Sequence, residues 1–349
     1  MKRPLARLFS CLVVCTVSSH IGAEQIEHKV QYIELAAPLD RGQAQFSGMS
    51  WCQGQLVLLP EKPWFVDEDD VLVPTTAAKA YVYSLEVAQL DAYLEATNKP
   101  EPLEATPIPL LENGVRDQLH EFDGYEAIAC QDESVWLAIE TELTETEYET
   151  NLVQANWVLQ GGQAALSIDP ETLRKVPSQS GVRNYSDETI LLNGEQLITI
   201  HEVNRHGDHA APYAHRIHTQ GEQRDTIAFP RIAYRITDAS SIDEDGYFWT
   251  INYLWSKEQD RFTPLDPLFA RYPRGATHRQ EPTVERLVQF RLESDSISRV
   301  ERAPIQLQLT KEDGRNWEGI VRYKDLGLLL VTDMHPQTIL GFVPFRQGL

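Results

Sequence analysis

The chain has 349 residues, of which 42% are hydrophobic, so it is long enough to bury a large core in one or two domains. It carries 52 acidic against 31 basic residues, a formal net charge of −21, and its basic residues are scattered. Such a surface repels nucleic acid and anionic lipid, which excludes nucleic-acid binding as an expected function.

The first 23 residues are typical of an export signal. Lys2, Arg3 and Arg7 precede the apolar run 8–17, and small residues surround Ala23. This run is too short to span a bilayer, so we expect cleavage near Ala23 and a periplasmic or secreted protein without a transmembrane segment. Lipid anchoring at Cys15 is the alternative. The mature chain, residues 24–349, would keep 28 basic and 52 acidic residues, a net charge of −24.

One short phrase recurs five times along the rest of the chain. Each copy opens with a small polar or acidic residue, and an apolar run then ends on a second polar residue 14 positions later, or 15 in the last copy. Strand-rich repeats of this length are typical of a β-propeller. We therefore expect a single all-β propeller domain of about five four-stranded blades, with six as the alternative. The first residues of the copies are Ser47, Glu126, Glu188, Asp238 and Glu318, and the second are Glu61, Glu140, Glu202, Asn252 and Asp333.

Alternating apolar and polar residues after each phrase predict the further strands of every blade. The last blade is one strand short after the run 338–342, and the early run 29–34 is a spare strand. We expect this N-terminal strand to complete the last blade, which closes the ring and removes exposed edges. The other predicted strands are 80–85, 105–110, 156–159, 164–168, 213–218, 225–228, 286–291 and 297–300.

Three long insertions, 61–76, 91–121 and 255–282, are rich in Pro, Asp and Arg. Loops of this length in a compact domain are usually functional or disordered. Any of them has room for a degenerate sixth blade.

Cys52 and Cys130 are the two cysteines that remain after signal cleavage. Export permits a disulfide, but the two residues occupy nearly the same place in repeats one and two. Equivalent positions in neighbouring blades usually stand farther apart than the roughly 7 Å between Cα atoms that a disulfide allows. We therefore expect two buried thiols, with a disulfide as the alternative.

The first residue of each copy carries the strongest functional signal, because the innermost strand of a blade directs it toward the mouth of the central channel. Glu126, Glu188, Asp238 and Glu318 are then expected to converge. Crowded carboxylates need a cation, protons or hydrogen-bond donors, and an all-oxygen ligand set favours Ca²⁺. We expect these four residues to bind a divalent metal; alternatively, they accept backbone hydrogen bonds and only hold neighbouring blades together.

Three of the phrases resemble those of a known family: Ser47-Gly48-Met49, the stretch 123–129 and Trp317-Glu318-Gly319-Ile320. They are similar to the repeat starts of exported phytase-like propellers, the group with esterase-like phytase activity. They resemble more distantly the calcium-dependent lactonase propellers of the gluconolactonase and regucalcin kind. The resemblance covers most of the mature chain and implies an acidic or calcium-bearing central site that hydrolyses phosphate or lactone esters. Ser47, Thr189 and Ser240 depart from the family pattern.

Half of the ten histidines lie between residues 201 and 218. His201 and His206 are five positions apart in a predicted strand and loop, which excludes the helical metalloprotease motif. On a loop at the channel mouth, Arg205, His206 and His209 would contact a phosphate or supply a base near an attacking water. The alternative is an exposed polar loop.

The sequence contains neither a Gly-x-Ser-x-Gly elbow nor a phosphate-binding glycine loop, which argues against an α/β serine hydrolase and a nucleotide enzyme. The favoured function is an exported, metal-dependent phosphoesterase or lactonase acting on a small molecule. A non-catalytic propeller that binds a ligand or a protein partner is the alternative, and we expect a monomer in either case.

Overall fold

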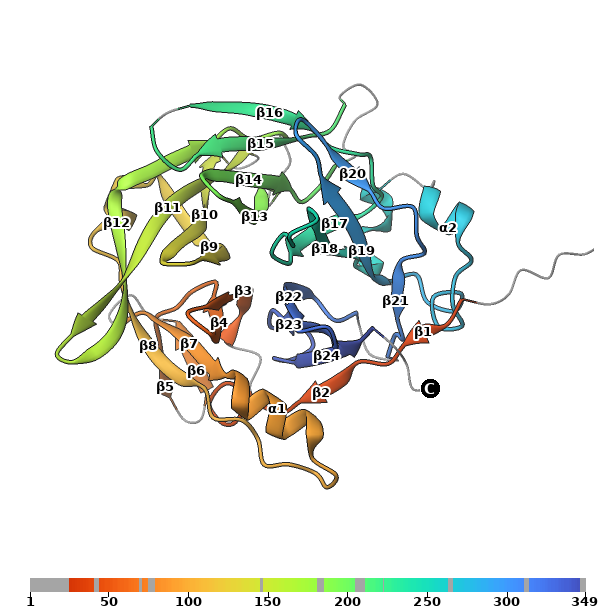
Figure 1. Ribbon diagram of the computed structural model, residues 1–349, viewed down its shortest axis with the longest axis horizontal. Helices are drawn as coiled ribbons and strands as arrows, with labels where there is room; N and C mark the ends of the chain where they lie inside the picture. Colours follow the sequence, from red (N-terminus) through yellow and green to blue (C-terminus); the bar gives the residue numbers. More distant parts are fainter. Residues whose placement is uncertain are drawn as a thin grey trace, which may run out of the picture.

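The structure, a computed structural model, describes residues 25–40, 44–68, 71–74, 79–144, 147–180, 185–204, 211–221, 223–262, 266–310 and 314–345. Their strands form five blades around a central axis (Figure 1). The expected β-propeller is therefore confirmed, with five blades and no sixth among the described residues.

In each blade, consecutive antiparallel strands run from the axis outward. Blade one comprises β3 (Phe46–Cys52), β4 (Gln55–Pro60), β7 (Tyr81–Glu86) and β8 (Thr106–Leu111). Blade two comprises β9 (Glu121–Gln131), β10 (Ser134–Thr144), β11 (Glu147–Gln160) and β12 (Gln163–Val176). Blade three comprises β13 (Asp187–Asn193), β14 (Gln196–His201), β15 (Tyr213–His218) and β16 (Arg224–Ala228).

Blade four has a divided outer strand, because two short strands pair with the same edge of β19. It comprises β17 (Arg235–Ala239), β18 (Tyr247–Leu254), β19 (Val284–Leu292), β20 (Ile297–Arg299) and β21 (Ile305–Leu307). Blade five comprises β22 (Trp317–Tyr323), β23 (Gly327–Thr332), β24 (Leu340–Pro344) and the N-terminal β2 (Gln31–Ile33).

The N-terminal segment closes the ring, as the sequence predicts. Strand β2 pairs antiparallel with β24, placing Ile33 opposite Leu340. The preceding β1 (Glu27–His28) runs parallel to β21 of blade four. The Glu27 carboxylate also accepts hydrogen bonds from the backbone N–H groups of Thr277 and His278. One short segment therefore joins the last two blades and covers the edges that an open sheet would expose.

Apolar side chains fill all five interfaces between blades, because each strand turns alternate residues to the neighbouring sheet. Separate clusters of buried residues join blades one and two, two and three, three and four, four and five, and five and one. The bulky Trp136 and Trp317 are fully buried in two of them. No one blade can bury its faces alone, so the stability of each blade depends on its neighbours in the ring.

A β-bulge interrupts the innermost strand of every blade at the repeat position. In blade three, Asp187 pairs with His201 and Thr189 with Ile200, which leaves Glu188 unmatched. The same irregularity occurs at Ser47, Glu126 and Glu318, and at Thr237-Asp238 in blade four. An extra residue re-aims the side chain at a bulge, so this feature explains how one sequence phrase serves all five blades.

The long insertions form secondary structure of their own. The first contains the hairpin of β5 (Phe65–Glu68) and β6 (Val71–Pro74). The second begins within α1 (Val87–Glu95) and contains the 3₁₀-helix η2 (Val115–Gln118). The third contains the 3₁₀-helix η3 (Ser256–Arg261) and α2 (Pro267–Arg271). None of the helices in the described ranges is long and apolar enough to cross a membrane.

The expectation of two free thiols is wrong, because Cys52 and Cys130 form a disulfide with a Cα–Cα distance of 5.3 Å. The spacing argument fails because both residues lie on innermost strands, where neighbouring blades approach most closely. At Gly48, for example, a Cβ atom would lie only 3.2 Å from the Cα of Ala127 in the next blade. The disulfide therefore links β3 to β9 near the axis.

Replacing both cysteines with serine should lower the free energy of unfolding by about 2–4 kcal/mol, because the bond closes a long loop in the unfolded chain. Urea unfolding of the oxidised protein and of the double variant measures the difference. Reducing agent should weaken the parent protein and leave the variant unchanged; equal stability of both proteins would contradict a formed bond.

Candidate functional site

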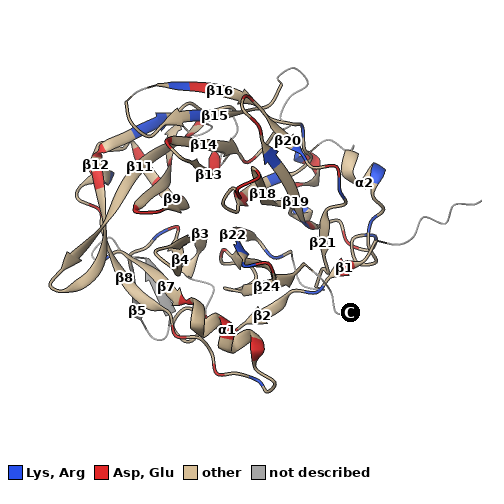
Figure 2. Ribbon diagram, in the orientation of Figure 1, with Lys and Arg blue, Asp and Glu red and all other residues tan. Residues whose placement is uncertain are grey.

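The repeat acids of three blades meet at one end of the axis. Glu126, Glu188 and Glu318 interact electrostatically with one another across blades two, three and five. Glu188 is buried, whereas Glu126 and Glu318 are half-buried. Figure 2 shows acidic residues on the inner strands around the axis. We call this end of the channel the acidic mouth.

Four of the five second residues of the repeats face the same end, a point that the sequence leaves open. The backbone explains this arrangement: the carbonyl of Glu61 accepts the N–H of Tyr125, and that of Glu202 accepts the N–H of Ile236. The end of one blade's second strand is thereby fixed beside the innermost strand of the next blade. Glu61, Glu140, Glu202 and Asp333 all join the acidic mouth.

Glu61 and Glu126 share one corner of the mouth, beside Gly124. A Cβ at position 124 would lie 2.6 Å from Oε1 of Glu126 and 3.1 Å from Oε1 of Glu61, so only glycine leaves room for both carboxyl groups. The two acids have different partners. Glu61 pairs with Nζ of Lys62 at 2.6 Å, whereas Glu126 is surrounded by other carboxyl groups.

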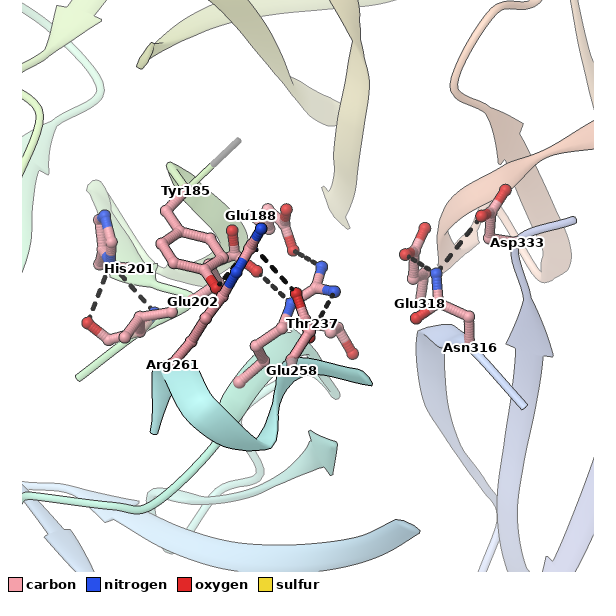
Figure 3. A network of polar contacts seen from close by, with 12 residues as sticks. Tyr185, Glu188, His201, Glu202, Thr237, Glu258, Arg261, Asn316, Glu318 and Asp333 are labelled. Atoms are coloured by element: carbon pink, nitrogen blue, oxygen red, sulfur yellow. Dashed lines mark hydrogen bonds and ion pairs between the residues drawn. The ribbon is translucent and has the colours of Figure 1, made fainter. Parts of the chain in front are cut away.

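A second pair of acids lies on blade five. Nδ2 of Asn316 donates to Oε1 of Glu318 at 2.5 Å and to Oδ2 of Asp333 at 3.3 Å, so one amide holds both side chains (Figure 3). Repulsion between Glu61 and Asp333 connects this pair to the Gly124 corner.

Arg235, the first residue of β17, is the cation at the centre of the other side of the mouth. Its Nε donates to Oε2 of Glu202 at 2.5 Å, its Nη2 lies 3.8 Å from Oε2 of Glu188, and its Nη1 lies 4.0 Å from Oε2 of Glu258. Glu258 belongs to η3, whose Arg261 reaches the hydroxyl of Tyr185 (Figure 3). Sequence reasoning missed Arg235, Glu258 and Lys62.

Burial raises the pKa values of these carboxyl groups, and their mutual repulsion raises them further. Burial raises the pKa of Glu140 to about 8, with Glu202 among the neighbours that add to the shift. Burial likewise raises the pKa of Glu202 to about 7, although Arg235 opposes the shift. The pKa of Glu126 stands well above its usual value because of burial and of Glu61, Glu140 and Glu318. The mouth therefore holds protons at neutral pH.

Asp238 does not join the other three predicted metal ligands. Its Oδ2 accepts the N–H of Ile320 in blade five at 2.8 Å. Ser47 acts similarly, since its hydroxyl donates to the carbonyl of Tyr125 in blade two. At these two repeats the side chains bind the backbone of a neighbouring blade and hold the two blades together, which is the alternative to metal binding.

The predicted catalytic residues Arg205, His206 and His209 lie outside the described residues. Two other histidines of the cluster are buried within blade three. His215 lies 3.0 Å through Nδ1 from Oδ2 of Asp187, and Nδ1 of His201 accepts the N–H of Val203. These contacts stabilise the blade.

The opposite end of the channel has a different character. A cavity of about 340 Å³ opens there, and all five innermost strands or their continuations contribute to its lining. Its walls include Met49, Ile128, Ile190 and Ile320. The repeat acids thus gather at the other end of the axis, although Asp243 and Glu244 also contribute to the lining of this cavity.

The donor atoms of the mouth are oxygens, as Ca²⁺ prefers. Within the described ranges, however, no three Asp, Glu, His or Cys side chains are arranged to hold a metal ion. The carboxyl groups instead meet Arg235, Lys62, Asn316 and one another. The residues present therefore do not form a ready metal site.

No protein-family model and no curated protein sequence matches the chain. Among solved structures, a GH43_1 enzyme from Xanthomonas citri is similar at a TM-score of 0.47 and 10% identity, over 92% of each chain. RS223 β-xylosidase matches at 0.46 and 10%, over 92% of this chain and 96% of that one. MPT-4, a mannose phosphorylase from Leishmania mexicana, matches at 0.44 and 12%, over 91% and 89%. Likeness at this level carries no argument about the chemistry of the mouth.

The free energy of unfolding should decrease between pH 5 and pH 8. Carboxyl groups with raised pKa values keep their protons in the folded protein while the unfolded chain loses them, so folding becomes less favourable as pH rises from about 4.5 to the folded pKa. The loss continues to about pH 7 for Glu202 and about pH 8 for Glu140. Urea unfolding across this range measures it.

The variant Glu140→Gln should flatten this dependence, because glutamine does not titrate. Glu133→Gln, on the exposed turn of the same blade, is the matched control and should keep the parent slope. A slope that Glu140→Gln leaves unchanged would show that this residue is ionised in the folded protein.

Proposed function

We propose that the chain is a hydrolase and that its active site is the acidic mouth. The observation that carries this proposal is the Glu61–Glu126 pair beside Gly124. Burial raises the pKa of both carboxyl groups, but Lys62 opposes the shift at Glu61, whereas the surrounding acids add to the shift at Glu126. Paired carboxyl groups whose environments differ in this way are typical of an acid–base pair.

The pair would hydrolyse an ester by general acid–base catalysis. Glu61 takes a proton from water as the water oxygen attacks the acyl carbon. The bond from that carbon to the leaving oxygen breaks, and Glu126 gives its proton to the leaving oxygen. One water is consumed, and proton exchange with solvent restores both carboxyl groups.

The charge of the mouth favours a neutral substrate. A phosphate monoester carries about two negative charges and would approach several acidic groups, which outnumber the basic residues Lys62, Arg235 and Arg261 among the described residues of the mouth. A lactone or another neutral ester meets no such barrier. The resemblance of the repeat starts to phytase-like and lactonase propellers supports a hydrolase. The charge of the mouth favours a lactone over a phosphate ester as its substrate. Calcium-dependent hydrolysis of phosphate esters is the alternative.

Purified protein should hydrolyse lactones or neutral nitrophenyl esters and leave nitrophenyl phosphate intact. Glu126→Gln and Glu61→Gln should each lower kcat by about 10²–10⁴-fold, because each removes one proton-transfer group. The parent protein should lose activity at high pH as Glu126 loses the proton that it donates. Glutamine does not titrate, so the pH profile of Glu126→Gln should not show this loss.

Glu133→Gln on the exposed turn is the control and should retain parent activity. Full activity in both mouth variants would place the reaction elsewhere. Carboxyl pairs also hydrolyse glycosides, so nitrophenyl glycosides are tested alongside the esters. Hydrolysis of a glycoside would support the acidic mouth as the active site but would contradict an ester as its substrate.

We also propose that the protein is exported and that residues 1–23 are removed. The Cys52–Cys130 disulfide supports an oxidising compartment. Mass spectrometry of protein recovered from the periplasm or medium should therefore give a chain that starts near residue 24 and carries this bond. A full-length chain with reduced cysteines in the cytoplasmic fraction would contradict export.

A further inference from the structure

Blade four differs from the other blades in what it contributes to the acidic mouth. Its repeat acid, Asp238, is bound to the backbone of blade five. Arg235, three residues earlier on the same strand, points to the acids of blade three instead. Blade four therefore contributes a cation to the mouth, beside Glu188 and Glu318, in place of its repeat acid.

The surroundings of Arg235 resemble those of a bound cation. Each nitrogen of its guanidinium group faces a different carboxylate: Nε faces Glu202, Nη2 faces Glu188 and Nη1 faces Glu258. Two of these acids come from blade three and one from η3, so the cation connects blade three to the third insertion. Glu318 of blade five adds to the favourable field.

The charge of Arg235 is permanent. Burial alone would lower the pKa of Arg235, but Glu202, Glu188 and Glu258 raise it well above its usual value. A guanidinium group is also weakly hydrated compared with an ammonium group or a divalent metal, so its burial among carboxylates costs less.

Two of its nitrogens make no hydrogen bond with a carboxylate of the described residues and can serve a ligand. Nη1 and Nη2 lie 4.0 and 3.8 Å from their nearest carboxylate partners, beyond hydrogen-bond distance. The side chain is 11% exposed, so part of it remains open to solvent. A planar pair of N–H donors is suited to an oxygen that becomes negatively charged, such as the carbonyl oxygen of an ester under attack.

We propose that Arg235 is the resident cation of the acidic mouth, taking the place of a divalent metal among Glu188, Glu202 and Glu258 and donating to a substrate oxygen. The first part is independent of the reaction, whereas the second rests on the proposed hydrolase function. The two parts are therefore tested by separate measurements.

Calcium titration tests the first part on the full mature protein and on Arg235→Met, which removes the charge but keeps a long side chain. The parent protein should give no binding heat, and its melting temperature should be equal in EDTA and in 10 mM CaCl₂. Arg235→Met leaves Glu188, Glu202 and Glu258 without their cation. It should melt at a lower temperature in EDTA and recover by about 5 °C or more in calcium.

Arg261→Met is the matched control, because Arg261 approaches the same Glu258 at 3.4 Å but is largely exposed. It should behave as the parent protein in both solutions. Calcium binding by the parent with a rise in melting temperature would overturn the proposal. A folded Arg235→Met whose melting temperature is the same with and without calcium would also overturn it. Should Arg235→Met not fold at all, the parent titration still decides.

The second part is tested with Arg235→Lys, which keeps the charge and loses the planar pair of donors. On the ester that the parent hydrolyses best, kcat should fall by about 10²-fold or more with a smaller change in KM, because the lost contact strengthens in the transition state. Unchanged kcat would overturn this part. A parent protein without hydrolase activity would instead refute the proposed function, and the calcium result would stand.

Discussion

Repulsion among carboxyl groups at one end of the axis is the constraint on which the rest of the structure depends. The bulges of the innermost strands bring Glu126, Glu188 and Glu318 into an environment that raises the pKa of each well above its usual value. A ring with this much like charge at its centre tends to open. It is held by apolar clusters at all five blade interfaces, by β2 in the last blade and by the disulfide between the first two blades. The stabilising contacts are thus distributed around the circumference, and the destabilising ones are concentrated where chemistry can use them.

The mouth reduces this repulsion in different ways on its two sides. Beside blade three, a permanent cation faces three carboxylates, and its charge is fixed by the covalent chain. Beside blades one, two and five, the compensation comes from Lys62, from the Asn316 amide and from protons held on the acids themselves. Protons can be given up and recovered during a reaction, whereas a buried guanidinium cannot. This division is the physical reason to place proton transfer at the Gly124 corner and charge stabilisation at Arg235.

The fold was largely predictable because its signal is local and repeated. Alternating strands, five similar phrases and a spare N-terminal strand each point to a closed propeller, and errors in one repeat are corrected by the other four. The disulfide was not predictable in the same way, because it depends on how closely innermost strands approach. That distance is set by small residues such as Gly48 and Ala127, which a blade-level argument does not resolve.

The site was only partly predictable, for a related reason. A repeat identifies equivalent positions, but the environment of each position comes from the neighbouring blade. Glu188 and Asp238 occupy equivalent places, yet one faces Arg235 and the other accepts a backbone N–H from blade five. Arg315 stands three positions before Glu318, as Arg235 stands before Asp238, but its guanidinium group pairs with Glu285 and not with the repeat acids. The sequence therefore does not separate Arg235 from Arg315, because the role of each arginine depends on which carboxyl groups the fold places beside its guanidinium group.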